Sequence, residues 1–378
     1  MPEQLLTGNV GEWSEVYVFF HIMGCHELVP CDGDLTPLAE NHLPVLTIYR
    51  GKGPKGELSY VYKDNVDGMW EIQLDGTSAG TVPAVEGQEE ANALLAGLLT
   101  AIKNHKKGSL QFPKAQKFLE RLCDSRLKAK STKKEDISLK LRDLRAGQTT
   151  TCGFSIKSYM GSEPTLLNSS GNATNFLCHV SGISCAEAEE INRMATTIKN
   201  GEEHINVQTV IQALKDKKAE VTFQSLLNGQ FEKNLRYVDT SMARLLGELV
   251  RTHYLTWQNK LSDVTDIVAE QDCLSLDDPE LYRHMVKMFL EAVAFGMTPA
   301  AKCWKGVPSA TGGFLIVKPD GELVTYHLYN REALDEYLLR YTKFEHPSTK
   351  RHKYGKIYPD ENGQLCLNLA LQIRFCKP

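Results

Sequence analysis

The stretch that decides the fold is DISLKLRDLRAGQTTTCGFSIKS, residues 136–158. Two runs of alternating apolar and polar residues flank a short segment that contains a glycine, which is the pattern of an antiparallel β-hairpin. In the second run, Phe154 and Ile156 lie on one face of the predicted strand. Ser155 and Lys157 lie on the other face. A lysine in the middle of a strand that looks buried raises the question of its function.

The spacing of the hairpin places an acid near this lysine. If the turn is centred on Ala146-Gly147, Asp136 lies opposite Lys157. Directly opposed residues of an antiparallel pair project from the same face, with Cα atoms roughly 4.5–5.5 Å apart. A simple cross-strand ion pair, worth about 0–1 kcal/mol, is one explanation of this pair.

A carboxylate beside a lysine at the open end of a sheet also suits phosphodiester hydrolysis. The carboxylate oxygens of Asp136 are the hard ligands that Mg²⁺ prefers. A bound Mg²⁺ polarises a phosphate and lowers the pKa of a bound water molecule. The ammonium group of Lys157 can orient that water and stabilise the charge that develops on the phosphorus oxygens.

The composition limits the class of protein. The chain has 378 residues, 42% hydrophobic and 24% charged, as in an ordinary globular protein. Its net charge of −4 means that binding to nucleic acid needs a local basic surface, and residues 114–134 are the most basic part of the chain. We expect no membrane span and no signal peptide. The ten cysteines form no C-x-x-C pair, which favours reduced thiols and a cytoplasmic location.

The remaining pattern mixes helices and strands and predicts an α/β or α+β fold. Asn9 with Glu12, and Ser184 with Glu187, form capping boxes that begin two helices, and we expect the second to run to about Lys199. The other expected features are three strands over 42–50, 57–63 and 68–76, a helix over 89–107, mostly helices over 207–300, a hairpin turning at Asp320-Gly321, a helix over 331–341, a polar loop over 344–355 and a final strand over 364–375. Residues 1–300 are predicted to form a core with helical elaborations, and residues 301–378 a β-rich portion packed on it.

Several segments resemble a known family. DISLKLRD followed by GFSIKS resembles the core of the PD-(D/E)xK nucleases, in which an Asp precedes a strand that carries acid-x-Lys. TGNVGEWSEVYV (7–18), GFSIKSYMGSEPTLLNSSGNATNF (153–176), ATGGFLIVKPDGELVTYHLYNR (310–331) and HPSTKRHKYGKIY (346–358) resemble the HpaII family of type II restriction endonucleases. The resemblance covers essentially the whole chain.

This resemblance implies a Mg²⁺-dependent enzyme that cuts double-stranded DNA at a short palindromic site, CCGG in the family's namesake. It further implies a restriction-endonuclease-like core, with a central mixed sheet flanked by helices. It also implies a homodimer and a functional, not physical, partnership with a cognate DNA methyltransferase.

Carried over by position, Asp136 matches the first acid of the motif and Lys157 its lysine. Ser155 stands where most relatives in the wider superfamily have the second acid, so another carboxylate must complete the metal site. Glu163, shortly after the strand, and Glu15, on the first helix, are the two candidates. Glu12 is expected to serve as the helix cap, and Asp143, nearer the turn, to be structural.

Base reading requires donors and acceptors aimed into the major groove, where Arg with guanine is the commonest pairing. Two polar segments offer such groups, and solvated surface loops are the alternative explanation for both. The candidates are Ser348, Thr349, Lys350, Arg351, His352 and Lys353 in one segment, and Thr165, Asn168, Ser169 and Asn172 in the other. Arg351 is the preferred base reader. Lys128 and Lys130 are expected to contact phosphates in a basic cleft formed by residues 114–134 and 350–353.

Two other classes of function compete with a nuclease. A non-catalytic DNA-binding protein could retain a decayed nuclease fold, but the presence of both Asp136 and Lys157 favours the enzyme. A metabolic enzyme whose lysine binds phosphate lacks support, because the chain has no G-x-G-x-x-G, Walker loop or nucleophile elbow in a suitable context.

Overall fold

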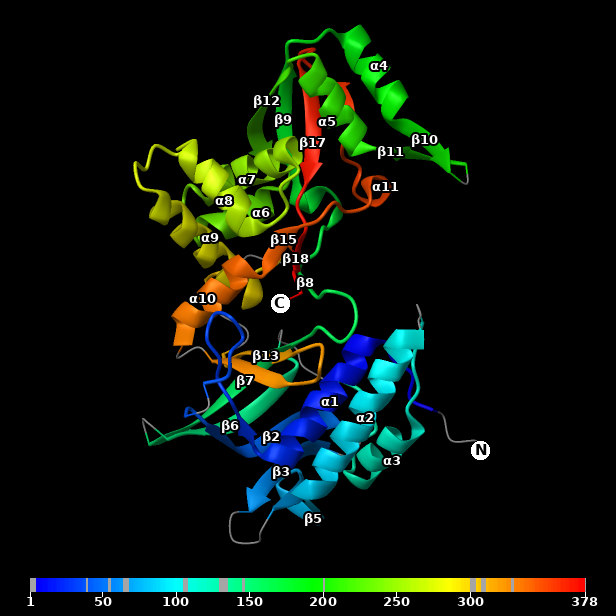
Figure 1. Ribbon diagram of the computed structural model, residues 1–378, viewed down its shortest axis with the longest axis vertical. Coiled ribbons are helices and arrows are strands. Elements are labelled where there is room, and N and C mark those ends of the chain that lie inside the picture. The colour runs from blue at the N-terminus through cyan, green and yellow to red at the C-terminus, as the bar shows by residue number, and fades with distance from the viewer. Residues whose placement is uncertain are drawn as a thin grey trace. The chain divides into compact units, whose positions relative to one another are not determined.

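The structure is a computed structural model that describes residues 5–38, 40–53, 56–63, 68–104, 108–128, 135–144, 147–199, 201–299, 304–306, 311–327 and 330–377 (Figure 1). The chain forms two compact units. The first unit consists of Met1–Pro164, Pro308–Tyr337 and Lys377–Pro378, and the second of Thr165–Val307 and Leu338–Cys376. Each unit combines separate segments of the chain, so their limits differ from the division at residue 300 expected from the sequence.

The first unit contains a nine-stranded mixed sheet in the order β14-β13-β7-β6-β2-β3-β4-β5, with β1 paired to β2. β13 and β7 run parallel, and the other neighbours run antiparallel. The strands are β1 (Glu27–Leu28), β2 (Leu43–Gly53), β3 (Gly56–Lys63), β4 (Met69–Leu74), β5 (Thr77–Pro83), β6 (Ile137–Asp143), β7 (Gln148–Ser158), β13 (Gly313–Val317) and β14 (Leu323–His327). The predicted hairpins β6–β7 and β13–β14 are confirmed.

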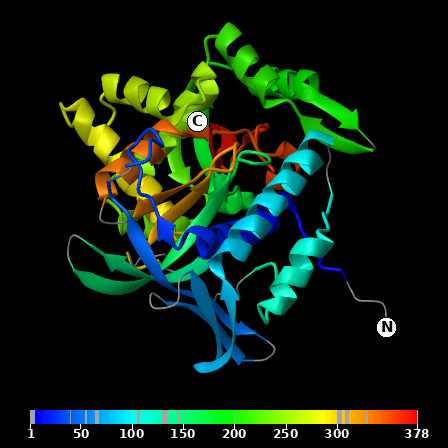
Figure 2. The same cartoon turned by 60° about the horizontal axis from the view of Figure 1, so that its bottom comes forward.

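Three helices accompany this sheet: α1 (Val10–Cys25), α2 (Ala84–Asn104) and α3 (Pro113–Arg121). α1 and α2 run side by side in both views (Figures 1 and 2). The predicted capping box is confirmed, because the Asn9 side chain accepts from the Glu12 N–H and the Glu12 carboxylate accepts from the Asn9 N–H. Nine residues of α1 are buried, which makes it the central helix of the hydrophobic core.

The second unit contains smaller sheets in the orders β12-β9-β17-β16 and β15-β18-β8, and a hairpin β10–β11. Its strands are β8 (Thr165–Leu167), β9 (Asn175–Ser181), β10 (Thr196–Lys199), β11 (Glu202–Ile205), β12 (Glu220–Leu226), β15 (Thr342–Phe344), β16 (Ile357–Pro359), β17 (Leu365–Ala370) and β18 (Ile373–Phe375). Its helices are η1 (Gly171–Thr174), α4 (Cys185–Ala195), α5 (Val207–Asp216), α6 (Gly229–Arg236), α7 (Met242–Thr256), α8 (Leu261–Glu270), α9 (Pro279–Ala294) and α11 (Thr349–His352). α10 (Arg331–Arg340) includes the division between the units at residue 337.

The second unit corrects three predictions. The capping box of α4 is confirmed, but the helix ends at Ala195 instead of Lys199, and the following residues form β10. The prediction that 207–300 is mostly helical is confirmed, with one strand, β12, among the helices. The expected polar loop holds α11, and the expected final strand is divided into β17 and β18.

Two bulk expectations can be compared with the structure. Among the described residues, no helix is long and apolar enough to cross a membrane. The nine cysteines in the described part of the chain are free thiols, and four of them are buried. The α/β class is confirmed, as a large mixed sheet flanked by helices.

Candidate active site

The hairpin β6–β7 holds Asp136 beside the centre of the sheet. The Asp136 N–H donates to the Phe154 carbonyl at 2.8 Å. Its Oδ2 accepts from the Ile156 N–H at 2.7 Å and from the Ser155 hydroxyl at 3.1 Å. The carboxylate is therefore fixed through Oδ2 by two donors on β7, and among the described residues Oδ1 accepts no hydrogen bond.

The predicted register of this hairpin was wrong by two residues. Ser138 pairs with Gly153 and Ile137 with Phe154, so Asp136 is level with Ser155 and not opposite Lys157. Side chains alternate with a period of two, so a shift of two residues keeps each on the same face. The acid and the lysine therefore still project from one face of the sheet.

Lys157 lies on β7, which is enclosed by β6 on one side and β13 on the other. Its side chain is half-buried, and its Nζ lies 5.5 Å from the centre of the Phe314 ring. Burial lowers the pKa of Lys157, while the negative charges of Asp136 and Glu15 raise it. The amine therefore lies within electrostatic reach of two carboxylates.

Glu15 approaches this group from α1. The helix is joined to β7 by a 2.9 Å hydrogen bond from the Ser14 hydroxyl to the Ser158 hydroxyl. Burial, and next repulsion from Asp136, together raise the pKa of Glu15 to about 8, against the attraction of Lys128 and Arg50. Glu15, Asp136 and Lys157 thus interact electrostatically, and we call these three residues the acidic cluster.

Sequence reasoning missed one residue near this cluster. Arg50 is 1% exposed and donates from its Nε to Asp124 Oδ2 at 2.8 Å, and its Nη2 donates to the Arg126 carbonyl at 2.9 Å. Its guanidinium also stacks on the Phe19 ring. The sequence did contain a signal for Arg50. It follows the buried Ile48 by two residues on β2, so both side chains lie on the same face, where an apolar residue is expected.

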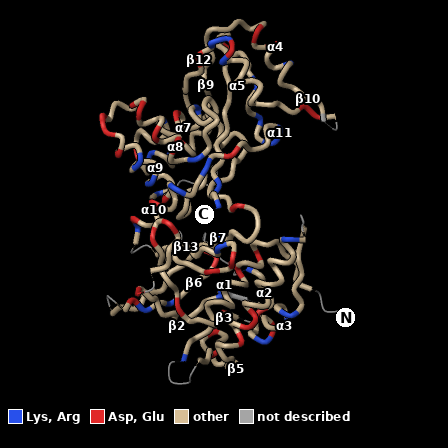
Figure 3. Tube along the Cα trace, in the orientation of Figure 1, with Lys and Arg blue, Asp and Glu red and all other residues tan. Residues whose placement is uncertain are grey.

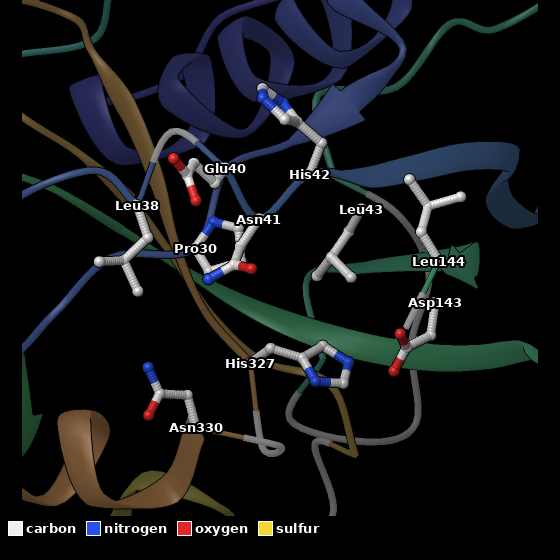
Figure 4. Close-up of a pocket in the computed structure, with 10 residues that line it drawn as sticks. All are labelled: Pro30, Leu38, Glu40, Asn41, His42, Leu43, Asp143, Leu144, His327 and Asn330. Carbon is white, nitrogen blue, oxygen red and sulfur yellow. The ribbon is translucent and has the colours of Figure 1, made fainter. Parts of the chain in front are cut away.

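The two remaining acids lie in different places. Glu163 is half-buried on the segment that follows β7. Of the two candidates for the missing acid, Glu15 is the one whose charge acts on both Asp136 and Lys157. Asp143 lies at the other end of β6 from Asp136, where it borders a cavity of about 220 Å³ together with His327 (Figure 4).

The donor set of the acidic cluster fits a hard divalent cation. Burial and repulsion from Asp136 raise the pKa of Glu15, and a cation between the two carboxylates favours their charged forms. Oxygen ligands of this kind are those that Mg²⁺ takes. Ser155 is 6% exposed and donates to Asp136, so it holds that carboxylate in a fixed orientation.

In the second unit, the structure brings together the two polar segments that the sequence nominated for base reading. His352 is buried, and its Nδ1 accepts from the Gly171 N–H at 3.0 Å. Its carbonyl accepts from the Asn175 side chain at 2.9 Å. α11 therefore packs against the segment 168–174, and we call residues 168–172 and 348–353 together the polar surface.

The members of the polar surface differ in their exposure and in their hydrogen-bond partners. Arg351, Lys353, Asn168 and Asn172 are exposed. Ser348 caps α11, Thr349 donates to the Ile205 carbonyl at 3.0 Å, Ser169 bonds the Thr174 hydroxyl at 2.9 Å, and Lys350 forms an ion pair with Glu202. Several basic positions lie on the trace at and around α11 (Figure 3). His352 is held by structural hydrogen bonds, so it is a support for this surface and not a free donor.

Part of the basic segment 114–134 is described. Lys114 and Lys117 are exposed on α3. Lys128 is exposed, and its Nζ lies 3.4 Å from Glu12 Oε1, so it also interacts with the capping glutamate of α1. Lys130 lies outside the described residues. The expected cleft joins segments of different units and stays a prediction.

The model of the HpaII restriction endonuclease family matches residues 9–375. The chain belongs to that family. It is also 34% identical over 375 residues to the type II restriction enzyme HpaII of Haemophilus parainfluenzae, which covers 98% of this chain and 99% of that enzyme. No solved structure matches the chain. The prediction of a type II restriction endonuclease is confirmed.

Proposed function

We propose that this member of the HpaII family hydrolyses phosphodiester bonds of double-stranded DNA at the acidic cluster. The observation that carries the proposal is the meeting of two carboxylates and a lysine where α1 packs on β7. The family supports the enzyme over a non-catalytic DNA-binding protein.

Asp136 and Glu15 would hold the metal ion, which we propose to be Mg²⁺. When bound, such an ion polarises the phosphate and makes a water molecule more acidic. Asp136 already has one oxygen fixed by the Ile156 N–H, so its second oxygen needs little reorganisation to act as a ligand. Ser155 keeps that carboxylate oriented, which compensates for the absence of an acid at its own position.

Lys157 contributes to the chemical step. The oxygen of the attacking water forms a bond to phosphorus and gives up a proton, while the bond from phosphorus to the leaving oxygen breaks and that oxygen takes up a proton. Negative charge grows on the other phosphorus oxygens. A half-buried ammonium group stabilises that charge more than a solvated one would, because the local dielectric is low. The Lys157 side chain also orients the water through hydrogen bonding.

We infer that the first unit carries a PD-(D/E)xK-like core. The hairpin β6–β7, the parallel neighbour β13 and the helical Glu15 on α1 support this assignment. In this interpretation Glu15 replaces the second acid of the motif, and Glu163 is the less favoured alternative. We retain the proposal that the portion after residue 300 helps to bind DNA, because α11 belongs to it.

DNA recognition would use the polar surface. Arg351 can pair bidentately with guanine O6 and N7, and Asn168 and Asn172 can hydrogen-bond to base edges directly or through water. A palindromic target such as CCGG would be read by two copies of the chain related by a two-fold axis. A cognate DNA methyltransferase would protect the host site.

The test is to incubate the purified protein with plasmid DNA and Mg²⁺ and to sequence the fragment ends. We expect cuts at one short palindromic sequence. The Asp136→Asn variant, purified in the same way, controls for contaminating nuclease. Binding to DNA without cleavage by the parent protein would favour the non-catalytic alternative.

A further inference from the structure

A second group of metal-ligating side chains lies in the second unit, apart from the acidic cluster. His179 on β9 pairs directly with Cys366 on β17. Opposed residues of an antiparallel pair project from the same face with Cα atoms roughly 4.5–5.5 Å apart. The sheet register therefore aims an imidazole and a thiol at one point.

The loop between β16 and β17 supplies a third group to this point. Asp360 Oδ1 accepts from the Asn362 N–H at 2.9 Å and from the Gln364 N–H at 2.8 Å. The Asp360 N–H donates to the Gln364 carbonyl at 2.8 Å, and the Gly363 N–H donates to the Asp360 carbonyl at 3.0 Å. One carboxylate oxygen is thus fixed by the hairpin, and the other can bind a ligand.

The three ligand atoms already lie close together. A side-chain nitrogen of His179, a carboxylate oxygen of Asp360 and the sulfur of Cys366 are within 4.8 Å of one another. Bonds of about 2.0–2.3 Å to a tetrahedral zinc ion place ligand atoms roughly 3.3–3.8 Å apart, so small side-chain rotations suffice. Among the described residues, the His179 ring has no hydrogen-bond partner that would resist this movement.

The donor types select a class of metal. An imidazole nitrogen, a thiolate sulfur and a carboxylate oxygen suit Zn²⁺ and similar transition-metal ions, whereas Mg²⁺ takes oxygen ligands. Three protein ligands leave a fourth position for water. The same residue types could form a nucleophilic thiol, but Cys366 is 1% exposed, which excludes attack on a large substrate.

We propose that His179, Asp360 and Cys366 form a transition-metal site of the zinc class in the second unit. The ion would join β9, β17 and the β16–β17 loop, in addition to the ladder hydrogen bonds and the bond from the Gln364 side chain to the Val180 carbonyl at 3.1 Å. Its role is structural stabilisation, because an ion bound only by the folded chain favours folding. This inference does not depend on the chemistry proposed for the acidic cluster.

The test uses Co²⁺ as a spectroscopic substitute for Zn²⁺ in the full chain after removal of metals with a chelator. We expect a thiolate-to-cobalt charge-transfer band together with the visible bands of a tetrahedral site. Stoichiometric Zn²⁺ should abolish both and raise Tm by a few degrees. Co²⁺ at the acidic cluster has only oxygen ligands and cannot give the thiolate band, so the two sites are distinguished.

Variants locate the site. Cys366→Ala should lose the thiolate band, and His179→Ala and Asp360→Asn should weaken Co²⁺ binding by more than the roughly 10–100-fold typical of losing an outer-shell partner. Cys185→Ser is the matched control, because Cys185 is an exposed free thiol of the same unit, and its spectrum should be unchanged. The partly exposed His179 and Asp360 keep the test valid if Cys366→Ala does not fold. The absence of a thiolate band in the parent protein, or its persistence in folded His179→Ala and Asp360→Asn with unchanged affinity, would overturn the proposal.

Discussion

Glu15, Asp136 and Lys157 in the first unit offer two carboxylates and an amine, whereas His179, Asp360 and Cys366 in the second unit offer an imidazole, a carboxylate and a thiol. Hard oxygen donors bind an ion that keeps exchangeable water, which suits hydrolysis. Softer nitrogen and sulfur donors hold a zinc-class ion tightly, which suits a structural role. The comparison teaches that donor chemistry, and not the mere presence of an acid, separates the two sites.

The largest expected effect separates the two sites by activity. Asp136→Asn should lower the rate of DNA cleavage by at least about 10³-fold, because it removes a metal ligand and its charge. Asp143→Asn, at the far end of the strand that Asp136 precedes, should change the rate less than about tenfold, and so should His179→Ala. Single-turnover cleavage of a cognate duplex measures all three. Cleavage by Asp136→Asn within tenfold of the parent would remove Asp136 from the active site.

Lys157→Ala should have the next largest effect. It removes transition-state charge stabilisation but no metal ligand, so we expect a loss of about 10²–10³ in the single-turnover rate. Mg²⁺ and DNA binding should be nearly unchanged. A defect in DNA affinity with a normal chemical step would instead identify a lysine that only positions phosphate.

Glu15→Gln tests the electrostatics of the acidic cluster through stability. The pKa of Glu15 is raised to about 8 from an unfolded value of 4.5, so the folded chain keeps a proton that the unfolded chain loses between these pH values. The metal-free parent should therefore lose stability as pH rises through this window. At pH 9 without metal, the Gln variant should be more stable by roughly 1–3 kcal/mol. This range is smaller than the full pKa shift implies, because solvent screens the partly exposed carboxyl.

Denaturant unfolding at pH 5 and pH 9 with a chelator measures this difference. At pH 5 the parent and the variant should have similar free energies of unfolding. A variant that is equally destabilised at both pH values would show that Glu15 contributes packing and not a titrating carboxyl. Glu163→Gln, at the alternative acid, is measured in the same way, so that the two candidate carboxylates can be compared.

The smallest effects concern DNA binding. Arg351→Ala should relax preference at one base pair, at a cost of about 1–3 kcal/mol in discrimination. Lys128→Ala should weaken binding to all sequences alike and reduce the log–log salt slope by about one unit. The same prediction applies to Lys130→Ala. Titrations against cognate and single-mismatch duplexes at several salt concentrations measure these changes. An equal loss on both duplexes with Arg351→Ala would move base reading to Asn168 and Asn172.

The sequence predicted the elements of the active site better than their pairing. Alternation within 136–158 predicted the hairpin and the shared face of Asp136 and Lys157, and the capping box predicted α1. The register was wrong because alternation fixes only the parity of pairing. α4 ended early because Thr196 and Thr197 are β-branched residues that favour the strand β10, and the capping signal concerns only the start of a helix.

Contacts between distant segments could not be predicted. His352 looked like a free polar donor, but it becomes buried when Gly171 from another segment donates to it. Arg50 was not singled out from the sequence, because its partner Asp124 lies on a distant segment. The pairing of His179 with Cys366 likewise depends on strands brought together only by the fold.

The central claim, that Asp136 and Glu15 hold the catalytic metal ion, is tested most directly by locating that ion. Fe²⁺ can take the place of Mg²⁺, because both ions accept oxygen donors. With ascorbate and peroxide, the bound Fe²⁺ cuts the backbone beside its ligands. We predict cuts near residues 15 and 136 that excess Mg²⁺ suppresses and that Asp136→Asn abolishes. Cuts near residues 179 and 366 should be suppressed by Zn²⁺ and persist in that variant. Mg²⁺-sensitive cuts that persist in Asp136→Asn, or that lie near residue 163 and not near residue 15, would contradict the account.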